Sequence, residues 1–198
     1  MVKNWKNYYT DNAVHHVTGT VHNWQPILLF PDIVAVFYQD FSQMLNRWNV
    51  NLLGYVIMPE HFHMLIQSYS SKNIMNFIRG GRRSISGKVK HIIENKDKKI
   101  ISFCAANNVS MNAFYIKTAG KSSFRFWKEK PRIFPITKET EIERKLDYIH
   151  NNPIKRGLVN SIEEWKHSSF RYYANSETVG LPINSWPQDV VRLGRTPS

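Results

Sequence analysis

Apolar residues dominate two neighbouring stretches of the chain, residues 51–58 and 61–68, which are separated by a short break at Pro59. Apolar runs of this length with a turn signal between them predict two strands. In the second stretch His61 and His63 alternate with apolar residues. Alternate side chains of a strand leave on the same face, so the pattern places the two imidazoles side by side, with about 7 Å between their Cα atoms.

Helical periodicity marks two longer segments around these strands. Apolar residues recur at helical spacing from Asp32, the expected N-cap, to about residue 49, and again over residues 73–94. Residues 13–20 are rich in β-branched side chains and predict a first strand. The first half of the chain therefore reads strand, helix, strand, strand and helix.

The second half of the chain gives weaker signals. Residues 100–115 are compatible with a strand or a short helix, and residues 119–123 have the composition of a loop. Thr137 begins a further helix with a capping-box pattern, and Pro153 stops or kinks that helix.

Length and composition predict a single globular domain over residues 1–198, with 42% hydrophobic residues and a sizeable core. We expect the core to span residues 13–173 and residues 174–198 to form a tail, part of which Trp186 and Val190 tie to the core. The single cysteine, Cys104, excludes an internal disulfide and a cysteine-based zinc site. The N-terminal segment lacks the apolar region of a secretory signal, so we expect a cytoplasmic protein.

The charge of the chain narrows the class of partner. Lys and Arg number 27 against 15 Asp and Glu, a formal net charge of +12. Such an excess is typical of proteins that bind polyanions, with nucleic acid as the first candidate and an anionic membrane surface as the second. No long apolar run supports the membrane alternative. Arg79, Arg82 and Arg83 cluster on the 73–94 helix, and we expect them to contact phosphates, although a basic helix face is often only solvated surface.

A second group of chemically capable residues lies near the end of the helix that begins at Thr137. Tyr148 and Asn152 are four residues apart and share a helix face, with about 6 Å between Cβ atoms. If that face looks at His61 and His63, the site combines two imidazoles, an amide oxygen and a phenol. This set suits Mg²⁺ or Mn²⁺, which polarises a phosphodiester while the phenol attacks phosphorus. Spacing alone favours a plainer interpretation, in which Tyr148 is a packed aromatic residue and Asn152 a helix-end residue.

Two segments resemble the signature motifs of a known family. Residues 58–65, Met-Pro-Glu-His-Phe-His-Met-Leu, and residues 148–159, Tyr-Ile-His-Asn-Asn-Pro-Ile-Lys-Arg-Gly-Leu-Val, are similar to the two motifs of the single-tyrosine HUH transposases, the IS200-like family. The subgroup resembled is the one associated with repetitive extragenic palindromes (REPs). Residues 16–18 and 165–172 are similar to the first strand and the closing segment of that family, in the right order.

The resemblance implies a fold and an activity. The fold is α+β, with a ferredoxin-like antiparallel sheet flanked by helices. The activity is the cleavage and rejoining of single-stranded DNA next to a hairpin, with a divalent metal (Mg²⁺ or Mn²⁺), a 5′-phosphotyrosine and a free 3′-hydroxyl. By position it implies His61 and His63 as the metal-binding pair, Tyr148 as the nucleophile and Asn152 as the third ligand. The residues expected to contact DNA phosphates are Arg79, Arg82, Arg83, Lys155 and Arg156.

Two positions depart from the family pattern, and several questions stay open. Glu60 stands where asparagine is common, and residues 128–132 replace an aspartate–histidine pair that many members carry. Phe126 and Trp127 are candidates for stacking on unpaired bases, with core packing as the simpler role. The alternatives to an enzyme are a protein that binds DNA hairpins without cutting them and an RNA-binding regulator. A monomer and a homodimer are equally compatible with the sequence.

Overall fold

The computed structural model describes residues 7–184. The helices and strands, in chain order, are β1 (Val14–Thr20), η1 (His22–Trp24), α1 (Pro31–Trp48), β2 (Asn51–Ile57), β3 (His61–Gln67), α2 (Ser71–Asn95), α3 (Lys98–Ala106), η2 (Met111–Phe114), β4 (Tyr115–Thr118), β5 (Lys121–Phe124), β6 (Arg132–Ile136), α4 (Glu139–His150), α5 (Asn152–Lys155), η3 (Ile162–Glu164) and α6 (Phe170–Asn175). Within this range, no helix is long and apolar enough to cross a membrane.

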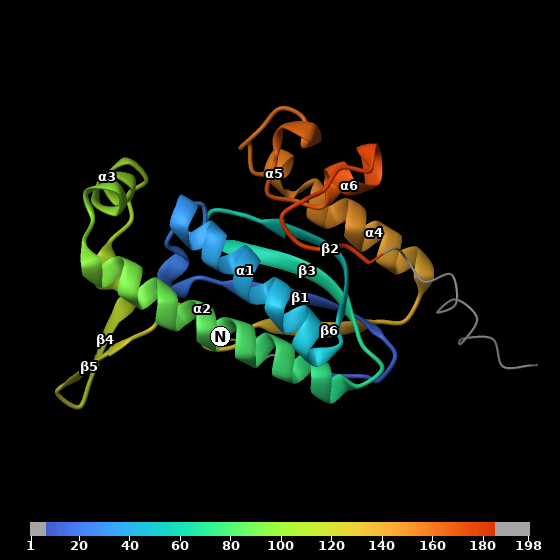
Figure 1. Ribbon diagram of the computed structural model, residues 1–198, viewed down its shortest axis with the longest axis horizontal. Helices are drawn as coiled ribbons and strands as arrows, with labels where there is room; N and C mark the ends of the chain where they lie inside the picture. Colours follow the sequence, from blue (N-terminus) through green and yellow to red (C-terminus); the bar gives the residue numbers. More distant parts are fainter. Residues whose placement is uncertain (1–6, 185–198) are drawn as a thin grey trace, which may run out of the picture.

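A four-stranded antiparallel sheet forms the centre of the protein, in the order β2-β3-β1-β6. The strands and their two long helices follow one another as β1, α1, β2, β3, α2 and β6, which is the ferredoxin-like succession. The predicted α+β class and antiparallel sheet are therefore confirmed. Helices α1 and α2 pack side by side over one face of the sheet, and α4 lies over the other (Figure 1).

Alternation along β3 divides its side chains between two apolar clusters. Phe62, Met64 and Ile66 join the larger cluster beneath α1 and α2. Leu65 joins a smaller cluster that includes Ile149 of α4. Because side chains alternate along a strand, His61 and His63 lie on the same face as Leu65. The two histidines of the strand therefore face α4.

The helix boundaries differ from the prediction in two places. Helix α1 has Phe30 as its N-cap and Pro31 at its first position, so Asp32 lies within the first turn and does not cap it. Proline is favoured there because the first N–H groups of a helix have no partner in the helix. Helix α4 begins at Glu139 with Lys138 as N-cap and no side-chain cap, so the capping box expected from Thr137 is not formed.

The segment between α2 and β6 is more regular than the sequence indicates. Part of residues 100–115 forms α3, the helical alternative, and a two-stranded hairpin follows it. The hairpin projects from the body of the protein beside α2 (Figure 1). Ala119 and Gly120 form its turn with φ values of 47° and 77°. The predicted loop over residues 119–123 is thus wrong for Lys121 and the two serines after it, which belong to β5.

Phe126 and Trp127 are core residues. Their exposed fractions are 0% and 6%, and the Trp127 indole donates a hydrogen bond from Nε1 to the carbonyl of Arg82, 3.0 Å away. The simpler of the two predicted roles, core packing, is the one the structure shows. Cys104 is a buried free thiol, and burial raises its pKa.

Irregular segments cover the outer edge of β2. The amide of Ile57 donates to the carbonyl of His167 at 2.8 Å. Further along the strand, Leu52 and Asn184 exchange hydrogen bonds of 2.9 Å in both directions. The contacts predicted for Trp186 and Val190 lie outside the described residues.

The outer edge of β6 is covered as well. The amide of Ile133 donates to Oδ1 of Asn7 at 3.2 Å, and its carbonyl accepts from the amide of Tyr8 at 3.4 Å. Pro135 has no N–H to offer at this edge, which is where a sheet tolerates proline.

Candidate active site

A row of aromatic rings crosses the face of the sheet beneath α4. The rings of His61 and His63 have centroids 4.9 Å apart. The ring of Tyr148, on α4, lies 5.8 Å from that of His63. The structure therefore brings the two predicted metal-binding histidines and the predicted nucleophile together from parts of the chain more than eighty residues apart.

Glu60 controls the orientation of His61. The carboxylate oxygen Oε1 of Glu60 accepts a hydrogen bond from Nδ1 of His61 at 2.9 Å and another from Arg156 at 2.8 Å. A carboxylate only accepts, so Nδ1 carries a proton, and in the neutral tautomer of this ring Nε2 keeps its lone pair. Burial opposes ionisation of Glu60, but His61 and Arg156 outweigh it and lower the pKa of the carboxyl group.

His63 is held by two groups of β1. Its Nδ1 lies 2.9 Å from the hydroxyl of Thr18 and 3.1 Å from Nε2 of His16. Burial, followed by the charges of His16, His61 and Lys145, lowers the pKa of His63 to about 2. The ring is therefore neutral at physiological pH, with Nδ1 engaged and no hydrogen bond to Nε2 among the described residues.

These two imidazoles fit a divalent metal. Both rings use Nδ1 for support and leave Nε2 for a ligand bond, the arrangement in which protein groups commonly orient metal-binding histidines. No cluster of three or more His, Cys, Asp or Glu side chains suited to a metal exists within residues 7–184. A third protein ligand at this face would therefore be an amide or hydroxyl oxygen.

Asn152, four residues after Tyr148, is the amide residue predicted as the third ligand. It is 8% exposed, and its Nδ2 donates to the carbonyl of Tyr148 at 2.8 Å. The two residues do not share one continuous helix, because α4 ends at His150 and Asn152 begins α5, with Pro153 in its first turn. The bond uses Nδ2 at the helix end, and Oδ1 accepts no hydrogen bond from residues 7–184.

Two lysines flank the phenol of Tyr148. The ammonium groups of Lys145 and Lys155 lie 4.8 Å and 5.0 Å from the centroid of its ring. The Tyr148 side chain is 38% exposed, so a substrate can reach it. Lys145 also borders a cavity of about 270 Å³ together with Phe134 of β6. Sequence reasoning missed Lys145, although its position three residues before Tyr148 places it on the same helix face.

Comparisons with known proteins identify the family of the chain. The family model described as "Transposase IS200 like" matches residues 11–129, more than half of the chain. The chain belongs to this family. A Haemophilus influenzae protein, named as a candidate REP-associated tyrosine transposase, is 20% identical over 176 residues, which cover 89% of this chain and 90% of that protein. A solved structure of a REP-associated tyrosine transposase bound to a REP hairpin has a TM-score of 0.63 at 15% identity and covers 93% of each chain.

These findings confirm the resemblance that the sequence motifs indicate. The structural match spans nearly the whole chain and shows the same fold. The family places the chain among the transposases.

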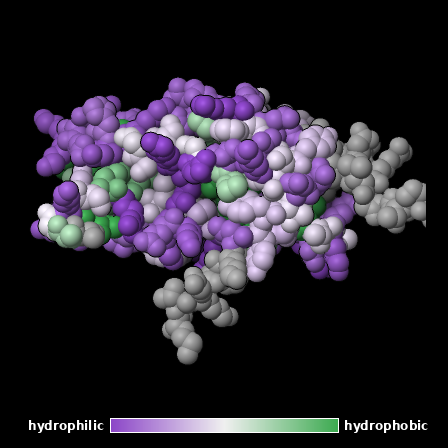
Figure 2. All heavy atoms as spheres, turned by 90° about the horizontal axis from the view of Figure 1, so that it is seen from below, coloured by the Kyte–Doolittle hydropathy of each residue, from purple (hydrophilic) through white to green (hydrophobic). Residues whose placement is uncertain are grey.

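The predicted phosphate contacts of this family member lie on two faces. Lys155 and Arg156 follow α4 and lie beside the site; Arg156 bonds to Glu60, and about half of its side chain is exposed. Arg79 and Arg83 instead line a groove of about 890 Å³ between α1 and α2, on the opposite side of the sheet. Hydrophilic residues dominate the side of the protein seen from below in Figure 2.

Arg82 differs from its neighbours on α2. Its guanidinium group donates to the backbone carbonyls of Lys128 and Glu129 and lies 5.7 Å from the centroid of the Trp127 ring. Burial lowers its pKa to about 10, so the group stays charged at neutral pH. Arg82 thus fastens the segment after β5 to α2.

Proposed function

We propose that the protein is a metal-dependent transposase of single-stranded DNA, which cleaves and rejoins strands near hairpins through a 5′-phosphotyrosine on Tyr148. The observation that carries the proposal is the packing of the Tyr148 ring against His63, 5.8 Å between centroids, on the face where His61 also lies. Membership of a transposase family supports DNA as the substrate. The solved relative was bound to a REP hairpin, which supports a hairpin as the partner structure.

The chemistry assigned to Tyr148 is a balanced exchange of phosphodiester bonds. The phenol oxygen forms a bond to phosphorus while the bond from phosphorus to the 3′ oxygen breaks. The phenol loses its proton to solvent, and the departing 3′ oxygen takes one up to become a hydroxyl group. Attack by a 3′-hydroxyl group on the phosphotyrosine reverses these changes and rejoins two strands.

Positive charge around Tyr148 supports this exchange. Lys145 and Lys155 lie against its ring and would balance charge that develops on the phosphate oxygens. His61, His63 and Asn152 would hold a divalent ion, which would supply Lewis-acid polarisation of the phosphate.

The second basic surface serves DNA that lies outside the site. Arg79 and Arg83 of the α1–α2 groove cannot share a phosphate with Tyr148, because the sheet lies between them. We assign them to the backbone of a more distant part of the substrate, together with Lys155 and Arg156 near the site. Arg82 is left out of this set because its guanidinium group holds backbone carbonyls.

The decisive test is a denaturing-gel assay with labelled, hairpin-bearing single-stranded DNA and Mn²⁺ or Mg²⁺. Wild type should give a protein–DNA adduct that survives denaturation, and Tyr148→Phe should give none. Tyr69→Phe is the matched control, since Tyr69 is a phenol with 73% exposure in the turn before α2, and it should give the adduct at the wild-type level. Omission of metal should abolish the adduct.

Other outcomes select the alternatives. If hairpin DNA binds tightly and no oligonucleotide gives an adduct with either metal, the protein is a binding protein that does not cut. If RNA hairpins bind more tightly than DNA hairpins, regardless of metal, the protein is an RNA-binding regulator.

A further inference from the structure

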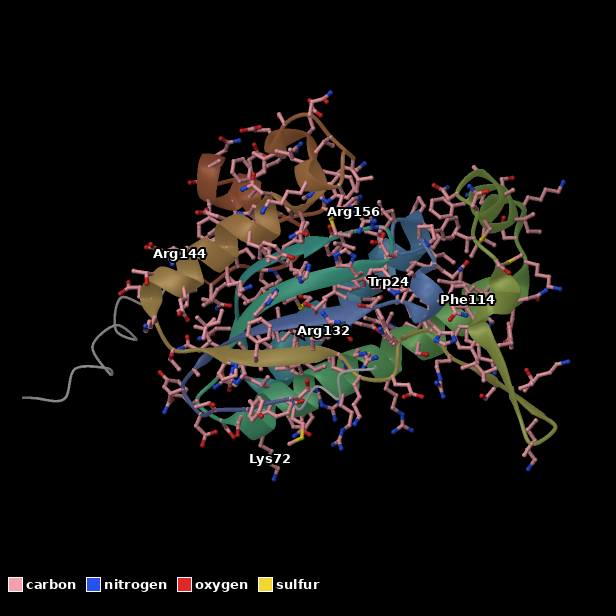
Figure 3. The ribbon with its side chains drawn as sticks, turned by 180° about the vertical axis from the view of Figure 1, so that it is seen from behind. Trp24, Lys72, Phe114, Arg132, Arg144 and Arg156 are labelled. Atoms are coloured by element: carbon pink, nitrogen blue, oxygen red, sulfur yellow. The ribbon has the colours of Figure 1, made fainter. Side chains whose placement is uncertain are left out.

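Trp24 is an exposed aromatic residue at the edge of the site. Its side chain is 55% exposed, whereas tryptophan usually buries its large ring. The ring centroid lies 6.1 Å from that of His61, with the planes inclined at 64°. Figure 3, which views the protein from behind, shows Trp24 on the turn beside the end of the sheet, with Arg156 above it.

The backbone holds Trp24 in a conformation that tryptophan rarely adopts. Asn23 and Trp24 have φ values of 52° and 56°, in the left-handed region. Asparagine tolerates this region, but a bulky side chain is an outlier there. Backbone hydrogen bonds fix the turn to the residue that precedes the histidine strand. The amide of Trp24 donates to the carbonyl of Val21 at 3.1 Å, and the amide of Val21 donates to the carbonyl of Glu60 at 2.9 Å.

Packing does not account for this conformation. More than half of the surface of Trp24 is exposed to solvent, so the turn does not gain a buried side chain in exchange for its backbone strain. Strained backbone conformations cluster at active sites and where proteins hold ligands. Phe126 and Trp127, the aromatic residues that the sequence offers for base stacking, are buried and cannot serve.

The order of the rings places Trp24 at the end of the series opposite Tyr148. Trp24, His61, His63 and Tyr148 follow one another, each ring within 6.1 Å of the next. In phosphoryl transfer the attacking and leaving oxygens lie roughly in line on opposite sides of phosphorus. With Tyr148 attacking from one end of the row, the departing 3′ oxygen points toward the other end.

We propose that Trp24 is the stacking platform for the unpaired base of the nucleotide that departs with the free 3′-hydroxyl group. This inference rests on the proposed function for the direction in which the DNA strand crosses the site. Stacking itself requires only that single-stranded nucleic acid binds across the site. Indole rings serve this purpose in proteins that bind single strands because every base presents a flat face.

The test measures binding and cleavage separately. Binding affinity is measured with the Tyr148→Phe protein, which cannot form the adduct. The ligands are a series of hairpin-bearing DNAs, each with one abasic position, and this position moves stepwise along the unpaired stretch. The same series is repeated with Trp24→Asn and Trp24→Phe in that background. Asparagine suits a positive φ, so Trp24→Asn should keep the thermal unfolding temperature of the parent protein or raise it.

The expected result is coupling between one base and Trp24. One abasic position should weaken binding about 5- to 150-fold in the parent protein, the range for loss of a single stacked base. The same position should have no effect in Trp24→Asn and an intermediate effect in Trp24→Phe. The cleavage site is mapped from the adduct of the wild-type protein, and this base should lie directly 5′ of the cleaved bond.

Other results overturn the inference. If every abasic position has the same effect with and without Trp24, the indole does not stack on a base. If Trp24→Asn lowers the unfolding temperature or Mn²⁺ affinity and leaves the abasic pattern intact, Trp24 shields His61 or supports the fold. If coupling is present and no adduct forms, stacking stands and the proposed chemistry fails.

Discussion

Gly19 of β1 is a position where a single methyl group should disturb both the core and the site. It pairs with Phe62 of β3, and a Cβ built on Gly19 would overlap Cε1 and Cζ of the Phe62 ring and lie 3.1 Å from Cδ1. The ring cannot swing away, because the rings of Phe37, Phe41 and Trp127 surround it with centroids 5.1, 5.4 and 5.6 Å away. Ordinary carbon contacts are about 3.5–4.0 Å, so the ring would have to move by roughly 1 Å.

The size of the effect follows from this crowding. Overpacking a core costs about 1–3 kcal/mol, and the enclosed ring places Gly19→Ala at the upper end. Alanine in place of glycine in a strand recovers about 0.5–1 kcal/mol. We therefore expect Gly19→Ala to lower the free energy of unfolding by about 2 kcal/mol. Because Phe62 stands between His61 and His63, the shift should also lower the rate of adduct formation.

A double-mutant cycle in urea isolates the contact. Phe62→Leu alone should cost about 1–2 kcal/mol, less than the 3–5 kcal/mol typical of Phe→Ala. In the double mutant the new methyl group occupies the vacated space, so the loss should fall at least about 1 kcal/mol short of the sum. Gly87→Ala is the control: its Cβ would meet nothing within 4 Å, and it should stabilise α2 by about 0.5–1 kcal/mol. A Gly19→Ala variant as stable as Gly87→Ala, or strictly additive losses, would contradict the argument.

Three further changes probe the site and the two basic surfaces. Thr18→Val removes the hydroxyl group that lies against Nδ1 of His63, and it should weaken Mn²⁺ binding about 10-fold or more, as measured by calorimetric titration. Unchanged affinity would show that the hydroxyl does not orient the ring. Replacement of both Arg79 and Arg83 by Gln should reduce the slope of log affinity for DNA against log salt concentration by about one unit for each lost phosphate contact. An unaltered slope would show that the groove is not part of the DNA interface. Arg82→Gln should instead lower the free energy of unfolding by about 1–3 kcal/mol, because two backbone carbonyls lose their donor; a stable variant with a reduced salt slope would reverse that assignment.

The sequence predicted those features that depend on periodicity within one element. Hydrophobic runs identify β2 and β3 to within one or two residues, and the period of two places His61 and His63 on one face. The predicted N-cap of α1 is wrong because Asp32 is a good capping residue by type, whereas Pro31 takes the first helical position and makes Phe30, two residues before Asp32, the cap. The hydrophobic pattern thus identifies the helix or strand, whereas the N-terminus of α1 depends on a neighbouring residue, Pro31.

Features that depend on how elements dock were beyond sequence pattern. Nothing in the spacing of Tyr148 shows which face of the sheet α4 covers; only the family resemblance implied that it meets the histidines. Lys145 and Trp24 gain their significance from that docking, and no periodic signal marks either residue. Glu60 looked like a departure from the family pattern, and its role as the acceptor that joins His61 to Arg156 depends on residues nearly a hundred positions apart.

The covered edges of the sheet bear on how copies of this chain can associate. An outer strand with unpaired backbone groups is the usual route by which one sheet continues into another molecule. Here Ile57 and Leu52 of β2 and Ile133 of β6 already exchange hydrogen bonds with segments of their own chain. A dimer that extends the sheet would have to peel those segments away first. Any pair of copies should therefore meet through elements other than the edges of this sheet, and its four strands should remain a closed unit within each copy.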